Sequence, residues 1–149
     1  MFLKAFTFIE TLVVLLIISI IASVAVYKSF FSLEKAHLLQ IKSDIALIRN
    51  AIIKKHNQSL LLGNVNRYPT KLDDALSNIA NEKLFDDVLD YPIFSTSHTQ
   101  KELSKWIKES KTIYSIYLTS SNSVSFNYDQ NKGTFECDFQ NKLCKELYQ

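Results

Sequence analysis

KAFTFIETLVV, residues 4–14, opens an apolar segment that continues to Tyr27. Between Phe6 and Tyr27 the chain has no Gly or Pro, and its only ionisable side chain is Glu10. As a helix that rises ~1.5 Å per residue, this segment would be about 33 Å long, enough to cross a bilayer core of ~30 Å. The sequence therefore predicts a transmembrane helix over residues 6–28.

The carboxylate of Glu10 needs a compensating cation, because a charge in an apolar helix in lipid costs up to roughly 2.5–3.5 kcal/mol at the centre and less near an end. A cut between Ala5 and Phe6 would remove residues 1–5 as a leader and create a new α-amine on Phe6, about one helical turn from Glu10. When identical helices lie side by side with an offset along their axis, the amine of one copy can meet the carboxylate of its neighbour. The pattern therefore predicts a device that sets the register of stacked helices.

AFTFIE, residues 5–10, and the apolar run to Val26 resemble the class III signal of type IV pilins and of the pseudopilins of type II secretion and DNA-uptake machines. The resemblance implies that a prepilin peptidase cuts between Ala5 and Phe6 and that Phe6 is then N-methylated. It also implies that Glu10 is the assembly carboxylate. The family usually has glycine before the cut, where this chain has Ala5, another small residue.

The same resemblance implies a location and a set of partners. The protein would pass once through the bacterial inner membrane, with its amino terminus in the cytoplasm and its carboxyl-terminal domain in the periplasm. After processing it would join other pilin or pseudopilin subunits in a helical filament, served indirectly by an assembly platform and its ATPase. We therefore expect a structural subunit of a type IV pilus, a secretion pseudopilus or a competence pseudopilus, and neither an enzyme nor a cofactor-binding protein.

Other interpretations of the amino terminus and of the function stay open. Ser23-Val24-Ala25 offers the small-x-small site of a conventional signal peptide. A leader with a single Lys and a carboxylate at the head of the apolar core fit such a signal peptide badly. An ordinary uncleaved anchor is a second interpretation. The alternative function is a minor pilin that binds DNA or a surface. With 17 Lys and Arg against 15 Asp and Glu, the formal charge of +2 gives DNA binding no electrostatic support.

The exported domain is predicted to comprise residues 29–149 and to begin with the amphipathic half of the long helix, residues 29–62. Apolar residues recur there at spacings of three and four, which is typical of a helix that packs one face on a core. They are Leu38, Ile41, Ile45, Ile48 and Ile52. Gly63-Asn64 is suited to a carboxyl-terminal cap of this helix.

The middle of the chain, residues 64–111, is predicted in less detail. Thr70 is suited to cap a short helix in which Asp73 favours the first turn, because the apolar residues Leu72, Leu76 and Ile79 follow at helical spacing. A second apolar cluster follows in residues 84–89. It consists of Leu84, Phe85, Val88 and Leu89.

Two groups of charges in the middle of the chain invite a binding interpretation beside the simpler one of a solvated surface. Asp86, Asp87 and Asp90 are carboxylates of the kind that bind calcium, but they lack the spacing of a known loop, so we predict no metal site. If residues 99–109 form a helix, the lysines of this stretch would lie around it beside Trp106 and would offer a patch for DNA, although a solvated surface is the favoured interpretation. The lysines are Lys101, Lys105, Lys108 and Lys111.

The carboxyl-terminal part, residues 112–149, has the pattern of an antiparallel sheet. Strand-forming residues fill 113–118, apolar and polar residues alternate over 124–128, and residues 129–133 form a turn before a third strand at 134–137. In an exported domain, Cys137 and Cys144 suggest one disulfide, whose eight-residue ring is worth about 2.5 kcal/mol. The predicted fold is thus α+β, a long amino-terminal helix packed on a small antiparallel sheet, and the resemblance implies that it is pilin-like.

Overall fold

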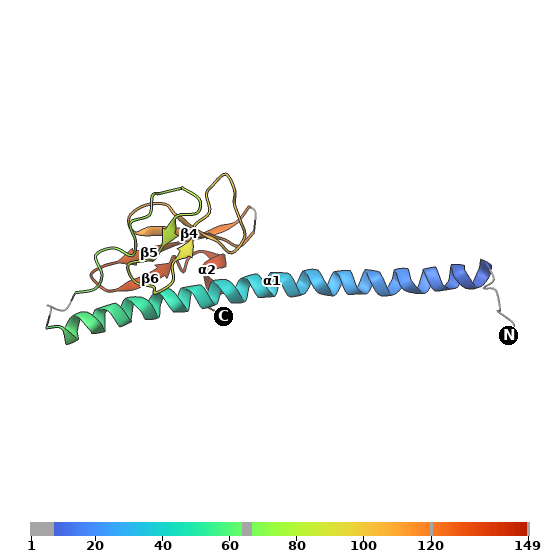
Figure 1. Ribbon diagram of the computed structural model, residues 1–149, viewed down its shortest axis with the longest axis horizontal. Coiled ribbons are helices and arrows are strands. Elements are labelled where there is room, and N and C mark those ends of the chain that lie inside the picture. The colour runs from blue at the N-terminus through green and yellow to red at the C-terminus, as the bar shows by residue number, and fades with distance from the viewer. Residues whose placement is uncertain (1–7, 64–66, 120, 149) are drawn as a thin grey trace. The chain divides into compact units, whose positions relative to one another are not determined.

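The structure is a computed structural model that describes residues 8–63, 67–119 and 121–148. The chain divides into two compact units, Met1–Ala36 and His37–Gln149. Helix α1 belongs to both units, and all other elements belong to the second (Figure 1). The elements are α1 (Phe8–Leu61), β1 (Lys83–Leu84), β2 (Ile93–Phe94), β3 (Trp106–Lys108), β4 (Ile113–Tyr117), β5 (Ser123–Asp129), β6 (Thr134–Cys137) and α2 (Lys142–Leu147). The fold class is α+β, as predicted.

The predicted location is corrected by the structure. Within the described residues, neither helix has both the length and the apolar character that a membrane crossing requires. The prediction had taken the apolar run up to Tyr27 as a helix that meets both requirements. The assignment to the bacterial inner membrane as a single-pass protein is therefore wrong.

Helix α1 ends where the sequence changes from good helix formers to glycine. Its last turn is closed by backbone bonds from the N–H of Leu62 to the carbonyl of Gln58 (3.2 Å) and from the N–H of Gly63 to that of Leu60 (3.0 Å). Gly63 has φ +74°, the left-handed conformation in which glycine carries no steric cost. The predicted cap at Gly63 is confirmed, while Asn64 lies outside the described residues.

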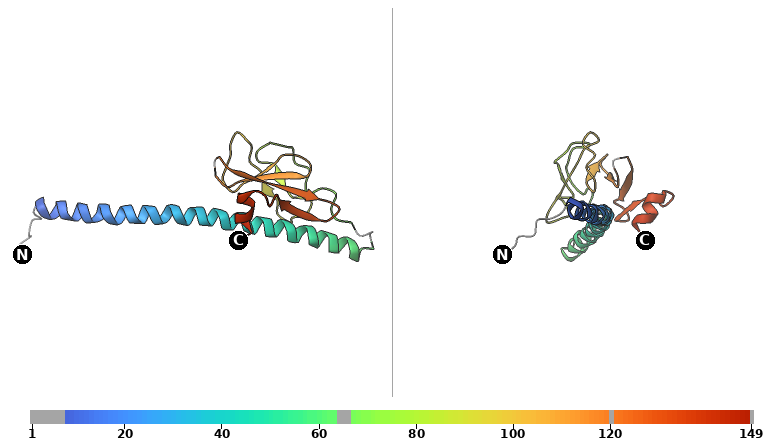
Figure 2. Two further views of the ribbon diagram at one scale, coloured as in Figure 1. Left: turned by 180° about the vertical axis from the view of Figure 1, so that it is seen from behind. Right: turned by 90° about the vertical axis from the view of Figure 1, so that its right-hand side faces the viewer.

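The core of the second unit forms between one face of α1 and the four-stranded sheet (Figure 1; Figure 2). Four isoleucines of the predicted stripe are at most 5% exposed, which confirms the amphipathic helix. They are Ile41, Ile45, Ile48 and Ile52. Aromatic side chains of the sheet lie in the same cluster, with the rings of Trp106 and Phe126 5.3 Å apart and those of Phe126 and Phe135 5.2 Å apart.

The sheet is an antiparallel meander in the order β3-β4-β5-β6. Strand β5 alternates as predicted: Val124, Phe126 and Tyr128 are buried, and the residues between them are exposed. The three predicted strands are confirmed, as is the turn before β6, where Gly133 has φ +67°. Residues 106–108, which were considered as part of a helix, form strand β3 instead. A separate two-stranded sheet pairs β1 with β2.

The short helix expected after Thr70 is absent from the described residues of this segment. The carboxylate of Asp73 instead accepts the backbone N–H groups of Ala75 (3.1 Å) and Phe85 (2.9 Å), so it fixes an irregular segment rather than a first helical turn. Of the apolar residues there, Leu72 is buried, but Leu76 and Ile79 are 65% and 46% exposed. The apolar cluster over residues 84–89 is buried, as expected.

Candidate functional site

The predicted processing residues are only partly within the described chain. Ala5 and Phe6, the predicted cleavage site and the predicted methylated residue, lie outside it. Glu10 lies in the first turn of α1 and is exposed. The structure thus describes one of the three residues that the resemblance places at this site.

Residues 8–24 of α1 form a surface that we call the amino-terminal apolar surface. Every residue in this range is exposed, among them Phe8 at 83% and Leu15 at 65%. The range consists of Val, Leu and Ile with few other residues, and Glu10 is its only ionisable side chain. Contiguous apolar surface of this extent is rare on a soluble monomer and marks a site of interaction.

The three hydroxyl side chains in this range do little to make the surface polar. Each donates to a carbonyl three residues earlier in the same helix: Thr11 to Phe8 (2.7 Å), Ser19 to Leu16 (2.8 Å) and Ser23 to Ile20 (2.7 Å). Because their donors are used within the helix, these side chains present no free hydroxyl hydrogen to a partner. Glu10 is left as the one strongly polar feature of the amino-terminal apolar surface.

The second unit contains a buried ionic centre around Asp73 that no local sequence pattern predicts. Lys108 Nζ lies 2.6 Å from Asp73 Oδ1, and the hydroxyl of Tyr114 donates to Asp73 Oδ2 at 2.9 Å. The side chains of Asp73 and Lys108 are 0% and 7% exposed. Burial and the neighbouring Asp73 carboxylate raise the pKa of Tyr114 well above its usual range. All four groups that face Asp73, two of them backbone N–H groups, donate hydrogen bonds, so this centre is a structural anchor.

The basic stretch that was weighed as a DNA-binding patch is dispersed in the structure. Lys108 is buried against Asp73, and Lys105 pairs with Glu102 at 2.7 Å. Trp106, the aromatic residue of the patch, is fully buried. Its indole N–H donates to Asp44 at 3.2 Å, while burial raises the pKa of that carboxyl above its usual range. Two of the four lysines and the one aromatic ring are therefore already engaged within the domain.

The three aspartates considered for calcium do not converge. Asp90 pairs with Lys54 of α1 at 3.0 Å, and this bond lowers the pKa of its carboxyl. Asp87 lies 3.4 Å from Lys71, which also contacts Asp74. Asp87 and Asp90 therefore serve as partners of surface lysines.

The carboxyl-terminal segment is fastened to the rest of the domain by a disulfide and by an arginine. Cys137 at the end of β6 pairs with Cys144 in α2, with their Cα atoms 5.9 Å apart. Arg49 of α1 donates to the carbonyl of Phe135 at 2.9 Å and to the hydroxyl of Tyr148, and its guanidinium lies 4.9 Å from the centre of the Tyr148 ring. Helix α2 itself was not predicted; its signal is Asn141, whose side chain accepts the N–H of Leu143 as an amino-terminal cap.

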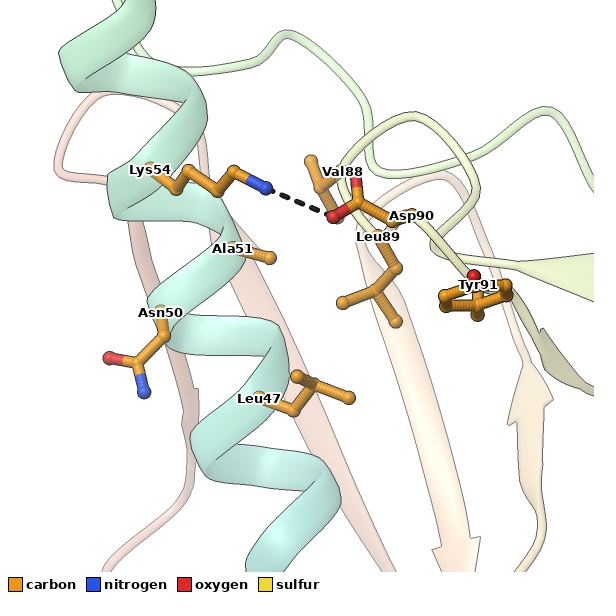
Figure 3. A pocket seen from close by; sticks show the side chains of 8 residues that line it. All are labelled: Leu47, Asn50, Ala51, Lys54, Val88, Leu89, Asp90 and Tyr91. Carbon is orange, nitrogen blue, oxygen red and sulfur yellow. Dashed lines mark hydrogen bonds and ion pairs between the residues drawn. The ribbon is translucent and has the colours of Figure 1, made fainter.

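A pocket of about 370 Å³ lies between α1 and the loop that precedes β2. Leu47, Ala51 and Lys54 of α1 face Leu89 and Asp90 across it (Figure 3). The Lys54–Asp90 ion pair lies at one end of the pocket. Most of the remaining lining is apolar. Its lining is completed by Asn50, Val88 and Tyr91.

Comparison of the chain with protein-family models, with curated proteins and with solved structures found no match.

Proposed function

We propose that this chain is a structural subunit of the type IV pilin and pseudopilin kind, cut between Ala5 and Phe6, methylated at Phe6 and assembled into a helical filament. The proposal is carried by one observation, the exposed amino-terminal apolar surface of residues 8–24, which begins within the AFTFIE motif of residues 5–10. Burying a Leu or Ile side chain yields about 1.5–3 kcal/mol. A bundle of such helices therefore provides the driving force for assembly.

Glu10 supplies the register in this proposal. Burying its carboxylate within a bundle of apolar helices is costly unless an opposite charge compensates it. The new α-amine of Phe6 on a neighbouring copy provides that charge when the two helices are offset along the axis. Only one offset satisfies every carboxylate and every amine, so the same pair sets both the affinity and the geometry of the filament.

The first test is the amino terminus of the protein purified from its source cells, by intact mass and terminal sequencing. A chain that starts at Phe6 with one added methyl group is the expected result. A start at Met1 contradicts processing, and a start at Val26 would identify a conventional signal peptide and remove Glu10 from the mature chain.

The second test separates the role of Glu10 from processing. Glu10→Val should be cut and methylated normally, while the yield of sheared filaments falls by about tenfold or more, since a lost buried charge pair costs several kcal/mol. Thr11→Val is the matched control, because the Thr11 hydroxyl is bonded to its own helix. Filaments from Glu10→Val at the control yield would refute the register argument.

The alternative function, a minor pilin that binds DNA, is not favoured by any observation on the described residues. It can be tested directly by measuring the binding of DNA to the full chain in a filter assay, where salt-sensitive binding would support it.

A further inference from the structure

A second cavity, which we call the loop pocket, lies where the segment that follows α1 meets the turn between β5 and β6. Its volume is about 320 Å³. This value is at the lower end of the range of ligand-binding pockets, about 300–1,000 Å³, so the loop pocket can hold a small polar molecule. Its lining consists of Arg67, Tyr68, Thr70, Gln130 and Asn131.

The two segments that form the loop pocket are held together by contacts of their neighbours. The hydroxyl of Tyr128 in β5 donates to the carbonyl of Pro69 at 2.6 Å. Gly133 lies so close to the ring of Tyr68 that a Cβ there would be 2.2 Å from it. The ring of His56 in α1 stacks on that of Tyr68, with ring centres 4.0 Å apart. A ligand would therefore meet a lining whose backbone is already fixed, which lowers the entropic cost of binding.

The polar side chains of the loop pocket are not used by the domain itself. Within the described part of the chain, the four lining side chains other than that of Tyr68 make no hydrogen bond or ion pair. The pocket of Figure 3 differs, because its charged residues, Lys54 and Asp90, pair with each other. In the cavity lined by Asp73 and Lys108, these two residues pair as well. The loop pocket thus keeps its donors and acceptors for a ligand.

Arg67 gives the loop pocket a positive charge. Among the described residues that line it there is no Asp or Glu. Asp129, the acid next to it in sequence, accepts the backbone N–H of Asn131 at 2.8 Å and is thus engaged in the turn. A guanidinium presents five N–H donors in a planar fork that matches the two oxygens of a carboxylate. The loop pocket therefore favours a ligand that carries a carboxylate.

The other side chains indicate what the rest of that ligand carries. The amides of Gln130 and Asn131 and the hydroxyl of Thr70 can both donate and accept hydrogen bonds. Hydroxyl groups have the same double capacity, so a ligand with several hydroxyl groups can pair with all three side chains. Phosphate mainly accepts hydrogen bonds and would leave the amide carbonyls unused. A carboxylate together with several hydroxyl groups is the chemistry of an acidic sugar.

We propose that the loop pocket is a binding site for an acidic sugar, with the carboxylate on the guanidinium of Arg67 and the sugar hydroxyls on Thr70, Gln130 and Asn131. The site lies in the second unit and includes no residue of α1. It is therefore a further function, which requires neither processing at Ala5 nor assembly through residues 8–24.

Titration of the full ¹⁵N-labelled chain in mild detergent with glucuronate, glucose and inorganic phosphate tests the class of ligand. We expect glucuronate to shift the amide signals of residues 130–131 and to bind at least about tenfold more tightly than glucose, which lacks the carboxylate, or phosphate, which lacks the hydroxyls. The absence of a saturable shift with glucuronate would overturn the proposal. Binding of glucose or of phosphate as tight as that of glucuronate would overturn it too.

A charge-matched pair of variants tests the role of Arg67. Arg67→Gln should weaken the binding of glucuronate by at least about tenfold, because it removes the charge-assisted hydrogen bonds. Lys83→Gln removes the same charge from an exposed lysine outside the loop pocket and should leave the binding within about twofold. Unchanged fluorescence of Trp106 shows that both variants are folded. Equal affinities of the two variants for glucuronate would overturn the assignment of Arg67.

Discussion

Lys108 Nζ lies 2.6 Å from Asp73 Oδ1 in the interior of the second unit, where neither side chain is appreciably exposed. Lys108 also donates to the backbone carbonyl of Asp73 at 3.2 Å, and Tyr114 completes the shell of the carboxylate. One charge therefore fixes three segments, the irregular stretch around Asp73, strand β3 and strand β4. The irregular stretch around Asp73 replaces the short helix that was expected after Thr70.

Lys108→Met is expected to lower the free energy of unfolding by about 3–5 kcal/mol, because it leaves the Asp73 carboxylate buried without its counter-ion. Urea unfolding of the full chain in mild detergent measures this, with the fluorescence of Trp106, the single tryptophan, as the signal. Lys105→Met is the control: its ion pair with Glu102 is exposed and worth less than about 1 kcal/mol. Equal losses from the two variants would contradict an anchoring role for Asp73.

The two glycines offer a matched pair for a second prediction. Both have positive φ, but a Cβ on Gly133 would lie 2.2 Å from the ring of Tyr68, whereas a Cβ on Gly63 would meet nothing within 4 Å. Movement of Tyr68 is restricted, because its ring stacks on that of His56 with ring centres 4.0 Å apart.

Gly63→Ala should therefore cost only the strain of the left-handed conformation, about 1–2 kcal/mol. Gly133→Ala adds overpacking against Tyr68 and should cost about 3 kcal/mol in total. The urea midpoints of the two variants compare these costs directly. If Tyr68→Ala does not relieve part of the loss in a Gly133→Ala background, the clash is not its cause.

Local sequence patterns were sufficient for part of α1, for strand β5 and for the turn before β6. The isoleucine stripe of α1, the alternation in β5 and the turn at Gly133 each follow from a repeat or from a backbone requirement within a few residues. The Asp73 centre follows from no local pattern, because Lys108 and Tyr114 lie 35 and 41 residues from Asp73 in the chain. Trp106 was considered for a surface patch because no local pattern shows that its indole meets Asp44 on α1.

Two buried tyrosines, Tyr114 and Tyr128, should make the free energy of unfolding depend on pH in the alkaline range. Burial raises the pKa of Tyr128 to about 12 and that of Tyr114 further still. As the pH rises above ~10, the unfolded chain loses these protons while the folded chain keeps them, so the free energy of unfolding falls. The stabilising contribution is fully present below pH ~10 and is lost progressively toward the folded pKa values, by up to about 1.4 kcal/mol per pH unit for each tyrosine.

Tyr128→Phe should make this alkaline slope shallower by about 1.4 kcal/mol per pH unit between pH ~10 and ~12. At neutral pH the same variant should lose about 1 kcal/mol, because the Tyr128 hydroxyl donates to the carbonyl of Pro69 at 2.6 Å. Urea titrations at several pH values measure both. Tyr91→Phe is the control, since the Tyr91 side chain is 87% exposed. An unchanged slope in Tyr128→Phe would show that Tyr128 does not titrate as described.

The last prediction concerns the Cys137–Cys144 disulfide and Arg49, which both hold the carboxyl-terminal segment. Removing the disulfide with Cys137→Ala and Cys144→Ala together should lower the free energy of unfolding by about 2.5 kcal/mol, the loop-closure contribution of a ring of this size. Since Arg49 also holds Tyr148, α2 should stay folded on α1 in that variant and detach when Arg49→Ala is added. Hydrogen exchange of the amides of α2 distinguishes these two states. Full exchange of α2 in the cysteine variant alone would mean that the disulfide, and not Arg49, holds the segment in place.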